Sequence, residues 1–227
     1  MAEIIGKAVI CALVAYFIGG INMAFFMAKL KGFDIRSKGT GNPGASNATI
    51  VMGKKAGVIC ALFDIFKAFT AVKLCGALFP DFPHAVIIAG ACCVLGHIFP
   101  IYLKFKGGKG LAALGGMAMA YDLKWFLILL LIEVVIILII DYICLIPTSG
   151  SIMFMILVGV QKGILFSLIF LPVVLIVCYR HIENFKKIRY GIEYRIRFLW
   201  KKEAEQQRVQ ANQAKLSEEQ KHLFMKE

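Results

Sequence analysis

Charged side chains are scarce in this sequence, and acidic ones are the scarcest. Asp, Glu, Lys and Arg make up 18% of its 227 residues, whereas about 25% is usual in a soluble domain. The hydrophobic fraction is 59%, against a usual value of about 45–50%. These proportions exclude an ordinary soluble globular domain. With 26 basic residues and 14 acidic ones, the charge that is present predicts apolar membrane spans joined by basic loops.

Motifs for nucleic-acid binding are also missing. A net charge of +12 would suit a nucleic-acid partner, but such a protein also needs a soluble face and a motif that combines aromatic and basic side chains. The sequence has no such motif, so we expect no nucleic-acid partner.

Paired cysteines are absent as well. None of the seven cysteines forms a CxxC pair, the spacing typical of metal and redox sites. Most of them lie in apolar runs, where a free cysteine behaves as a small hydrophobic side chain. We therefore expect neither a metal site nor a disulfide. The cysteines are Cys11, Cys60, Cys75, Cys92, Cys93, Cys144 and Cys178.

Long apolar runs dominate what remains. A helix needs about 20 apolar residues to cross a bilayer. The fourth run is short, and the break at Asp141 between the fifth and sixth is a weak signal, so six or seven spans are possible. The first run is too long for a signal peptide and has no small-residue cleavage site, so we expect it to be retained. The expected spans are roughly 5–28, 56–79, 83–103, 108–121, 124–141, 143–160 and 163–180.

Lysine and arginine alternate between the connections. Residues 29–55 and 104–109 are rich in them, Pro80–His84 has none, and the links near Asp122 and Gly163 have one lysine each. By the positive-inside rule, this alternation predicts an N-terminus outside and a C-terminus in the cytoplasm. An odd number of spans follows, which favours an all-α bundle of about seven transmembrane helices.

The end of the chain differs sharply in composition from the rest. Residues 201–227 are rich in Gln, Lys and Glu and contain neither Gly nor Pro. We expect residues 1–200 to form the transmembrane domain. Residues 201–227 would be a charged cytoplasmic C-terminal extension, either a solvated helix or a partly disordered segment.

The segment Lys104–Gly110, KFKGGKG, is the first candidate for chemistry. Adjacent glycines allow a backbone that turns successive N–H groups inward, and such a nest binds anions. The spacing differs from GxxxxGK[ST], which excludes a Walker A loop. On this segment alone, a phosphate site and an ordinary basic turn at lipid headgroups are about equally supported.

The segment Gly39–Asn47, GTGNPGASN, is the second candidate. A flexible linker would account for its glycines and serine, but not for the interspersed asparagines or for Arg36 just before it. An arginine side chain binds phosphate through a fork of N–H donors. We therefore interpret this segment as a functional loop.

Two histidines mark further candidates. His97 ends an apolar run shortly before Lys104–Gly110, and His181 lies where the last span ends. Asn184 follows His181 by three residues, so the two share one side of a helix. Taken alone, each segment is also explained as a structural or polar helix end.

Three ionisable residues fall inside expected spans. Asp64 and Lys67 are three residues apart, and because charges in a membrane are costly and usually paired, we expect a structural ion pair. Glu133 is isolated in its span, where we expect an interior polar contact.

Three segments, in order and at matching spacing, resemble motifs of the bacterial acyl-phosphate:glycerol-3-phosphate acyltransferases, the PlsY family. The family patterns are close to KxxGxDIRxxGSGNxGATN, GHxFPxFLxFKGGKGVA and HxENIxR. The matching segments here are Lys29–Asn47, Gly96–Ala112 and His181–Arg189. The whole match runs from about residue 16 to Glu193.

This resemblance implies a membrane enzyme of seven spans, with its active site at the cytoplasmic face of the bacterial cytoplasmic (inner) membrane. The reaction would move a fatty acyl group from acyl phosphate to the 1-hydroxyl of sn-glycerol 3-phosphate, giving lysophosphatidic acid and phosphate. This is the first acylation step of phospholipid synthesis. The resemblance also implies that neither acyl-CoA nor a metal or other cofactor takes part, and that the partners are the two substrates and the lipid bilayer.

Carried over to this sequence, the motifs name two sets of residues and one further residue, Glu183, that would support the fold. The catalytic set is Arg36, Lys109, Ser151, His181 and Asn184. The substrate-binding set is Gly41, Asn42, Gly44, Asn47, His97, Lys106, Gly107, Gly108, Gly110 and Thr148.

Two assignments keep an alternative. Thr148 and Ser151 enter through the stretch TSGSI, which aligns with a family stretch SLxSI, but Cys144 is another counterpart. The base that takes the proton of the attacking hydroxyl is either His181 or the substrate's own phosphate.

The chain departs from the family near the end of its first apolar run. The family motif GSIP reads Gly19–Asn22, GGIN, in this sequence. Gly20 therefore stands for the family serine and Asn22 for the proline, and one hydroxyl is lost.

Two other functions are compatible with a polytopic membrane protein. A transporter for a phosphorylated metabolite is disfavoured, because transporters tend to show internal repeats and polar groups near the membrane midplane, whereas these motifs cluster on one expected face. The second is a non-catalytic membrane scaffold. In that case the chain would be a family member that lost activity through the Gly20 and Asn22 changes.

Overall fold

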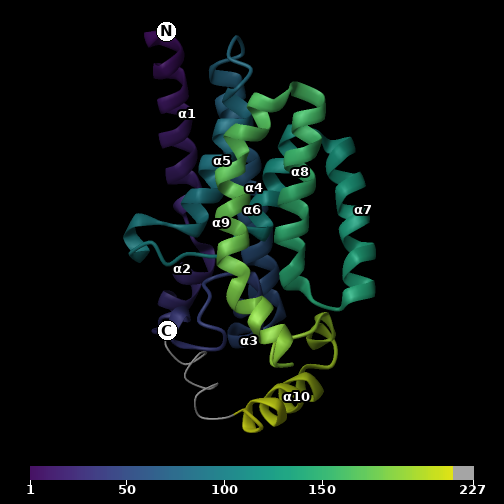
Figure 1. The fold of residues 1–227 in the computed structure, drawn as a ribbon. Helices are drawn as coiled ribbons and strands as arrows, with labels where there is room; N and C mark the ends of the chain where they lie inside the picture. The colour runs from purple at the N-terminus through teal and green to yellow at the C-terminus, as the bar shows by residue number, and fades with distance from the viewer. Residues whose placement is uncertain (217–227) are drawn as a thin grey trace.

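The computed structural model describes residues 1–216, and every regular element in that range is helical. The long helices run roughly parallel to one another in an elongated bundle (Figure 1). The part of the predicted extension that covers residues 217–227 lies outside the described residues. The helical bundle that the sequence predicts is confirmed.

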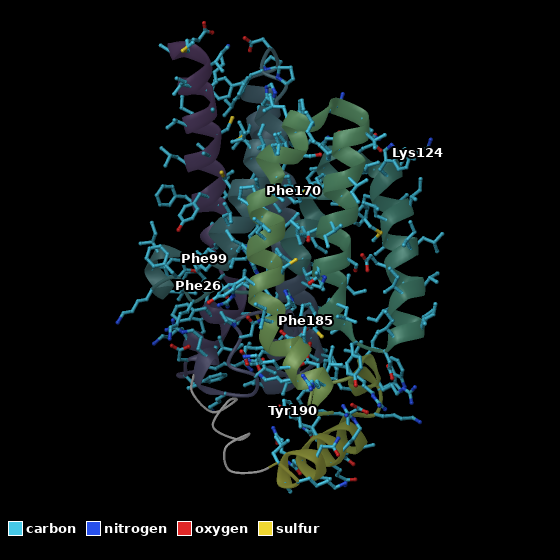
Figure 2. The ribbon with its side chains drawn as sticks, in the orientation of Figure 1. Phe26, Phe99, Lys124, Phe170, Phe185 and Tyr190 are labelled. Atoms are coloured by element: carbon cyan, nitrogen blue, oxygen red, sulfur yellow. The ribbon has the colours of Figure 1, made fainter. Side chains whose placement is uncertain are left out.

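The two ends of the bundle carry different segments. The N-terminus lies at the upper end in Figure 1, together with the start of α7 (Leu123–Ile140), where Lys124 is labelled in Figure 2. The lower end holds the last turns of α9 (Ile164–Arg189), near the labelled Tyr190.

The first predicted span, 5–28, is interrupted. α1 (Ala2–Gly20) ends before Asn22, and α2 (Met23–Leu30) begins after it. The side chain of Asn22 accepts a hydrogen bond from the Phe25 N–H at 2.8 Å. This bond caps α2 in the manner usual for asparagine, so a single polar residue divides the apolar run.

The second predicted span, 56–79, is part of a long helix. α3 (Ala45–Met52) and α4 (Lys54–Leu78) are separated by Gly53, which has a φ of 93°. With 25 residues, α4 is about 37 Å long, which exceeds the roughly 30 Å core of a bilayer.

The third and fourth predicted spans are connected by an excursion of the chain. α5 (Ala85–Ile98) is followed by the short 3₁₀ helix η2 (Ile101–Leu103) and then by α6 (Leu111–Tyr121). Figure 1 shows the connecting segment projecting from the side of the bundle. α6 has 11 residues and is about 17 Å long, so it does not cross a bilayer by itself.

The predicted break at Asp141 is confirmed. Asp141 has a φ of 68° and ends α7. The short 3₁₀ helix η3 (Ile143–Leu145) follows, and α8 (Ile146–Lys162) then runs back along the bundle toward α9.

Each predicted span thus coincides with helical structure, the first with two helices, α1 and α2, but the number of crossings stays a prediction. By length and composition, five helical segments of the described chain could cross a membrane. α4 is not among them because of its charged residues, and α6 is too short. The five segments are Ala2–Leu30, Ala85–Leu103, Leu123–Ile140, Ile143–Lys162 and Ile164–Arg189.

Glycine contacts bring α1 and α5 close together. A Cβ atom on Gly19 would collide with the backbone of Cys93, and one on Gly96 would collide with the backbone of Tyr16. Small residues allow such close helix packing in membrane proteins. This contact fixes the lower end of α5, from which the projecting segment starts.

Most of the described part of the tail is helical. After η4 (Ile196–Leu199), α10 (Lys202–Ala214) lies at the lower end of the bundle (Figure 1). Glu205 and Val209 on α10 are buried. This helix therefore packs against neighbouring segments, which the prediction of a solvated extension did not include.

Candidate active site

The Lys104–Gly110 segment folds back onto the end of α5. The N–H groups of Gly107 and Gly108 donate to the carbonyls of Ile98 and His97, at 3.0 and 3.1 Å. These two donors are used inside the protein, so they do not form the anion nest that two adjacent glycines would allow. Further backbone donors lie in the first turn of α6, where N–H groups have no acceptor within the helix and carry partial positive charge.

The neighbours of this segment leave no room for side chains at its two adjacent glycines. A Cβ on Gly108 would collide with the imidazole ring of His97, and one on Gly107 would collide with the His97 carbonyl and with Pro100. The glycines therefore keep the loop close to α5, whatever their role toward a ligand, and their substrate contacts stay a prediction.

Replacing Gly108 by alanine tests this close packing. We expect Gly108→Ala to displace the loop and to lower kcat/KM for acyl transfer by at least about 10-fold, because displacements of about 1 Å can cost 10²-fold. Gly6→Ala is the matched control, since a Cβ on Gly6 meets nothing within 4 Å. Steady-state kinetics that do not distinguish the two variants would contradict the expectation.

Lys109 and Asn184 meet although they are 75 residues apart. The ammonium group of Lys109 donates to Oδ1 of Asn184 at 2.5 Å. Asn184 is buried, and its Nδ2 donates in turn to Oε1 of Glu193 at 2.9 Å. Two residues that the motifs named as catalytic are therefore in direct contact.

Glu193 ends this chain of hydrogen bonds and was not among the predicted site residues. Burial raises the pKa of its carboxyl group, although the hydrogen bond from Asn184 and the charge of Lys109 act in the opposite direction. The Cys144 thiol is a further hydrogen-bond partner of this carboxyl. Glu193 lies at the limit of the resemblance, in a turn where no motif marks it.

His181 lies about one helical turn before Asn184 on α9, so the two share one side of the helix as their spacing predicts, and both are buried. Nδ1 of His181 lies 2.8 Å from the carbonyl of Val177. Because a carbonyl only accepts, Nδ1 carries a proton, which leaves Nε2 of the neutral ring as an acceptor. Next to His181, Arg180 donates to the carbonyl of Gly107 at 3.3 Å, so α9 holds the loop at a second point.

Arg36 links the Gly39–Asn47 region to the projecting segment. Its guanidinium pairs with the Asp34 carboxylate, with a shortest distance of 2.7 Å, and Nη1 donates to the carbonyl of Leu103 at 2.9 Å. The hydrogen bond from Arg36 holds the pKa of Asp34 below its ordinary value. The structure thus brings Arg36 to the segment that carries Lys109.

Asn47 supports its own loop. Its Nδ2 donates to the carbonyls of Ile35 and Lys38, and its Oδ1 accepts from the Thr40 N–H at 2.8 Å. The amide is fully buried, and both of its amide hydrogens are used. Its predicted substrate contact stays a prediction, but its hydrogen bonds are those of a residue that shapes the loop.

Asn42 differs from Asn47 in its hydrogen bonding. Its Oδ1 is buried and has no hydrogen-bond partner in the part of the chain that the structure describes. Gly41, with a φ of 74°, and Gly44 flank it in the turn. Because buried polar atoms are normally hydrogen-bonded, Asn42 is the residue of this loop whose geometry best suits a ligand contact.

The two predicted hydroxyl residues of α8 also differ in whether their hydroxyl groups have a hydrogen-bond partner. Ser151 is fully buried and donates to the carbonyl of Thr148 at 3.0 Å within the helix. Oγ1 of Thr148 is buried without a partner among residues 1–216. Of the alternatives left open, the structure places Cys144 next to Glu193, whereas Ser151 is engaged within α8.

Two predicted residues lie at the surface. Lys106 is exposed on the projecting segment. Glu183 forms an ion pair with Lys186 at 2.9 Å on the exposed side of α9. Such exposed pairs contribute about 0–1 kcal/mol, so this contact gives little of the fold support expected of Glu183.

A buried charge cluster lies under the loop. Lys67 pairs with Asp64 at 2.6 Å, as the sequence predicts. The same ammonium lies 3.0 Å from Nδ1 of His97 and donates to the carbonyl of Ile21 at 2.7 Å. The cluster therefore joins α4 to the end of α5 and to the break between α1 and α2.

The isolated Glu133 has the interior polar contact that the sequence predicts, because it accepts a hydrogen bond from Ser149 at 2.8 Å.

Removing one member of this cluster should weaken the fold. We expect Lys67→Met to lower the free energy of unfolding by about 3–5 kcal/mol, because it leaves the Asp64 carboxylate buried without its main partner. Lys73→Met is the control, since Lys73 lies on the same helix with an exposed side chain. Thermal unfolding in detergent micelles measures both. Equal stability of the two variants would show that the buried pair adds nothing.

The departure at Asn22 has a clear structural role. Its Nδ2 donates to the carbonyl of Pro43 at 2.8 Å, and its backbone N–H donates to the Tyr102 hydroxyl at 3.0 Å. The Tyr102 ring stacks on Phe26 with a centroid distance of 5.9 Å, at the left side of the bundle in Figure 2. Asn22 thus ties the break, the Gly39–Asn47 loop and the projecting segment together. A Cβ on Gly20 would make only ordinary contacts at 3.9 Å, so there is space for the serine that the family has.

Comparison with known proteins agrees with the motifs. The family model described as Glycerol-3-phosphate acyltransferase matches residues 9–191. A glycerol-3-phosphate acyltransferase of Aquifex aeolicus (strain VF5) is 34% identical over 192 residues, covering 83% of this chain and 99% of that protein. One of Thermosipho melanesiensis is 38% identical over 180 residues, covering 79% and 88% of the two chains.

Solved structures give the same result. The fold is similar to that of PlsY, an integral membrane glycerol 3-phosphate acyltransferase, in its glycerol 3-phosphate form. The TM-score is 0.75 at 31% identity, and the match covers 85% of this chain and 96% of that one. Its lysophosphatidic acid form gives a TM-score of 0.73. The resemblance of the motifs is therefore confirmed: the chain is an integral membrane protein and belongs to the glycerol-3-phosphate acyltransferase family.

Proposed function

We propose that this protein transfers a fatty acyl group from acyl phosphate to the 1-hydroxyl of glycerol 3-phosphate, forming lysophosphatidic acid and phosphate. One observation carries the proposal: Lys109 of the projecting segment lies against Asn184 of α9 at 2.5 Å. The similar PlsY structures, a glycerol 3-phosphate form and a lysophosphatidic acid form, agree with this substrate and product.

The reaction brings two phosphate groups close together, so the site must offset their repulsion. Lys109 supplies one positive charge, and the first turn of α6 adds the partial charge of its N–H groups. Arg36 supplies a second positive charge from the neighbouring segment. Charges fixed in this way also stabilise the phosphate as it leaves with extra negative charge.

The chemical step is a direct displacement at the acyl carbon. The hydroxyl oxygen of glycerol 3-phosphate forms a bond to the carbonyl carbon, and the bond from that carbon to the phosphate oxygen breaks, with its electron pair leaving on phosphate. The hydroxyl and the carbonyl carbon need to be held about 3–3.5 Å apart. The hydroxyl proton passes either to Nε2 of His181 or to a phosphate oxygen of the substrate. No protein nucleophile is required, because acyl phosphate is already activated.

Apolar space lies beside the proposed phosphate site. A cavity of about 100 Å³ lies between α6, α7 and α8, and Leu111, Leu114 and Phe154 are among its lining residues. Leu111 follows Lys109 by two residues. An acyl chain entering this cavity from the membrane would place its phosphate end near Lys109.

The membrane and its sidedness belong to the proposal as well. We place the protein in the bacterial cytoplasmic membrane with the active site facing the cytoplasm. The alternation of lysine and arginine between the connections supports this orientation. The basic segment 29–55 and the end of α9 both lie at the lower end of the bundle, opposite the N-terminus (Figure 1).

Phosphate release from the purified, detergent-solubilised protein tests the proposal. We expect release to require both acyl phosphate and glycerol 3-phosphate, to fail when acyl-CoA replaces acyl phosphate, and to persist in the presence of EDTA. Mass spectrometry should identify one lysophosphatidic acid for each phosphate released. Absence of product from protein that is folded and monodisperse would favour the scaffold alternative.

A further inference from the structure

The chain of hydrogen bonds from Lys109 ends in a turn that has no helix of its own. Glu193 lies in residues 190–195, between α9 and η4, which we call the α9–η4 turn. Its carboxylate holds Asn184 at 2.9 Å, and Asn184 holds Lys109. The position of Lys109 therefore depends on what fixes this turn.

Arg208 on α10 fixes the turn from below. Its Nη1 donates to the carbonyl of Gly191 and its Nη2 donates to the carbonyl of Glu193, both at 2.6 Å. Asn212, one helical turn later, donates to the same Gly191 carbonyl at 2.8 Å. The guanidinium thus binds two carbonyls of the turn at once, and one of them belongs to Glu193 itself.

Glu205 holds Arg208 in this orientation. Its carboxylate accepts from Nε and Nη2 of Arg208 at 2.8–3.2 Å, and it also accepts from the backbone N–H of Arg195 at 3.3 Å. Burial alone would raise the pKa of Glu205, but these hydrogen bonds outweigh it and the pKa is lowered. The carboxylate is therefore ionised near neutral pH, and the buried Glu205 and the partly buried Arg208 form one clamp across the turn.

This clamp lies outside the part of the chain that the family match covers. The match ends at residue 191, whereas Glu205 and Arg208 belong to α10 (Lys202–Ala214). The resemblance therefore assigns no role to either residue.

We propose that Arg208 is a positioning residue for acyl transfer: together with Glu205 it fixes the α9–η4 turn, so that Glu193 holds Asn184 against Lys109. This inference rests on the proposed function. The C-terminal extension is then a working part of the active site, although none of its described residues is assigned a contact with substrate.

The first test replaces Arg208 by methionine in the full-length protein. We expect Arg208→Met to lower kcat by about 10-fold, because small displacements of a catalytic group reduce the rate strongly. The KM values for both substrates should change less than about 3-fold, since the residue acts on Lys109 and Asn184 through the turn. Lys215→Met and Gln207→Met are the controls: both residues are exposed on or just after α10, and the first also removes one positive charge. Both controls should keep the wild-type kcat.

A double-mutant cycle separates positioning from general stability. If Arg208 acts through Glu193, then Arg208→Met should lower kcat about 10-fold in the wild type but less than about 2-fold in a Glu193→Ala background, because coupled residues are non-additive. A general loss of stability would lower activity equally in both backgrounds. Thermal unfolding in the same detergent gives the folded fraction by which each rate is divided. If Arg208→Met does not fold, Glu205→Gln removes the partner of Arg208 and takes its place in the cycle.

The outcomes distinguish this inference from the proposed function. An inactive wild-type protein overturns the proposed function. An active wild-type protein overturns the present inference alone if Arg208→Met matches Lys215→Met, or if the effects of Arg208→Met and Glu193→Ala simply multiply. A kcat loss that disappears in the Glu193→Ala background supports it.

Discussion

Lys109→Ala is expected to lower kcat for acyl transfer by about 10²–10³-fold, the range seen when a single group that stabilises developing negative charge is removed. The structure places the Lys109 ammonium on Asn184, a residue of a different motif. Removing it takes away a charge next to the phosphate that leaves, and it also leaves the Asn184 amide without that donor. The protein should still insert into the membrane, because Lys109 lies in the connection before α6 and not within it.

Two variants of the same loop make this result specific. Lys104→Ala removes an equal charge from an exposed position at the start of the segment, and we expect less than about a 3-fold change in kcat, because exposed charges are screened. Lys109→Arg keeps the charge but changes the shape of the donor, and should recover part of the rate. Phosphate release under saturating substrate measures all three variants. Normal turnover by folded Lys109→Ala would remove Lys109 from the proposed site.

Much of the fold follows from the apolar runs alone. Each run is long enough to define a helix, and Asp141 marks a true break because its positive φ ends α7. The break at Asn22 was not predicted, since hydropathy averages over many residues and one asparagine among apolar neighbours barely changes it. A local signal was nevertheless present: asparagine is among the preferred N-cap residues, and Asn22 stands directly before Met23, the first residue of α2.

The candidate site was predictable where a short segment matches a family motif. Lys109, His181 and Asn184 are of this kind: taken alone, their segments are also explained as a basic turn or a polar helix end, and the resemblance of the motifs names them as site residues. The contact between Lys109 and Asn184 comes from the structure. Glu193 and Arg208 are different. Each matters only through contacts made after α9 has turned and α10 has packed against it, and a charged residue in a charged tail gives no sign of such a contact.

The direction in which the N–H groups of the glycine pair point could not be predicted from the sequence either. Two adjacent glycines suggested an anion nest, yet the N–H groups of Gly107 and Gly108 donate to carbonyls at the end of α5. A glycine pair allows several backbone conformations, and the end of a helix offers unpaired carbonyls that compete for the same donors. Which acceptor these N–H groups bind depends on where α5 ends relative to the loop, and that is a property of the packed bundle.

Arg36→Ala is expected to lower kcat/KM by about 10²-fold. A forked, permanently charged donor is well matched to a phosphate group, and an alanine offers neither the charge nor the fork. The change also removes the hydrogen bond to the Leu103 carbonyl, which joins the Gly39–Asn47 region to the segment that carries Lys109. Arg36→Lys retains the charge without the planar fork and should fall between the two, at about a 10-fold loss.

A second substitution distinguishes the two roles of Arg36. The Asp34 carboxylate is paired with the Arg36 guanidinium at 2.7 Å and therefore uses part of its hydrogen-bonding capacity. If Arg36 mainly binds substrate phosphate, Asp34→Asn weakens a competing partner, and kcat/KM for glycerol 3-phosphate should be retained or should rise. If Arg36 mainly fixes the loop through Asp34, the same change should lower activity nearly as much as Arg36→Ala.

Arg197→Ala is the matched control for Arg36→Ala, because Arg197 is also paired with a carboxylate, that of Asp141 at 2.7 Å. A loss in Arg36→Ala no larger than in Arg197→Ala would show that Arg36 serves neither role.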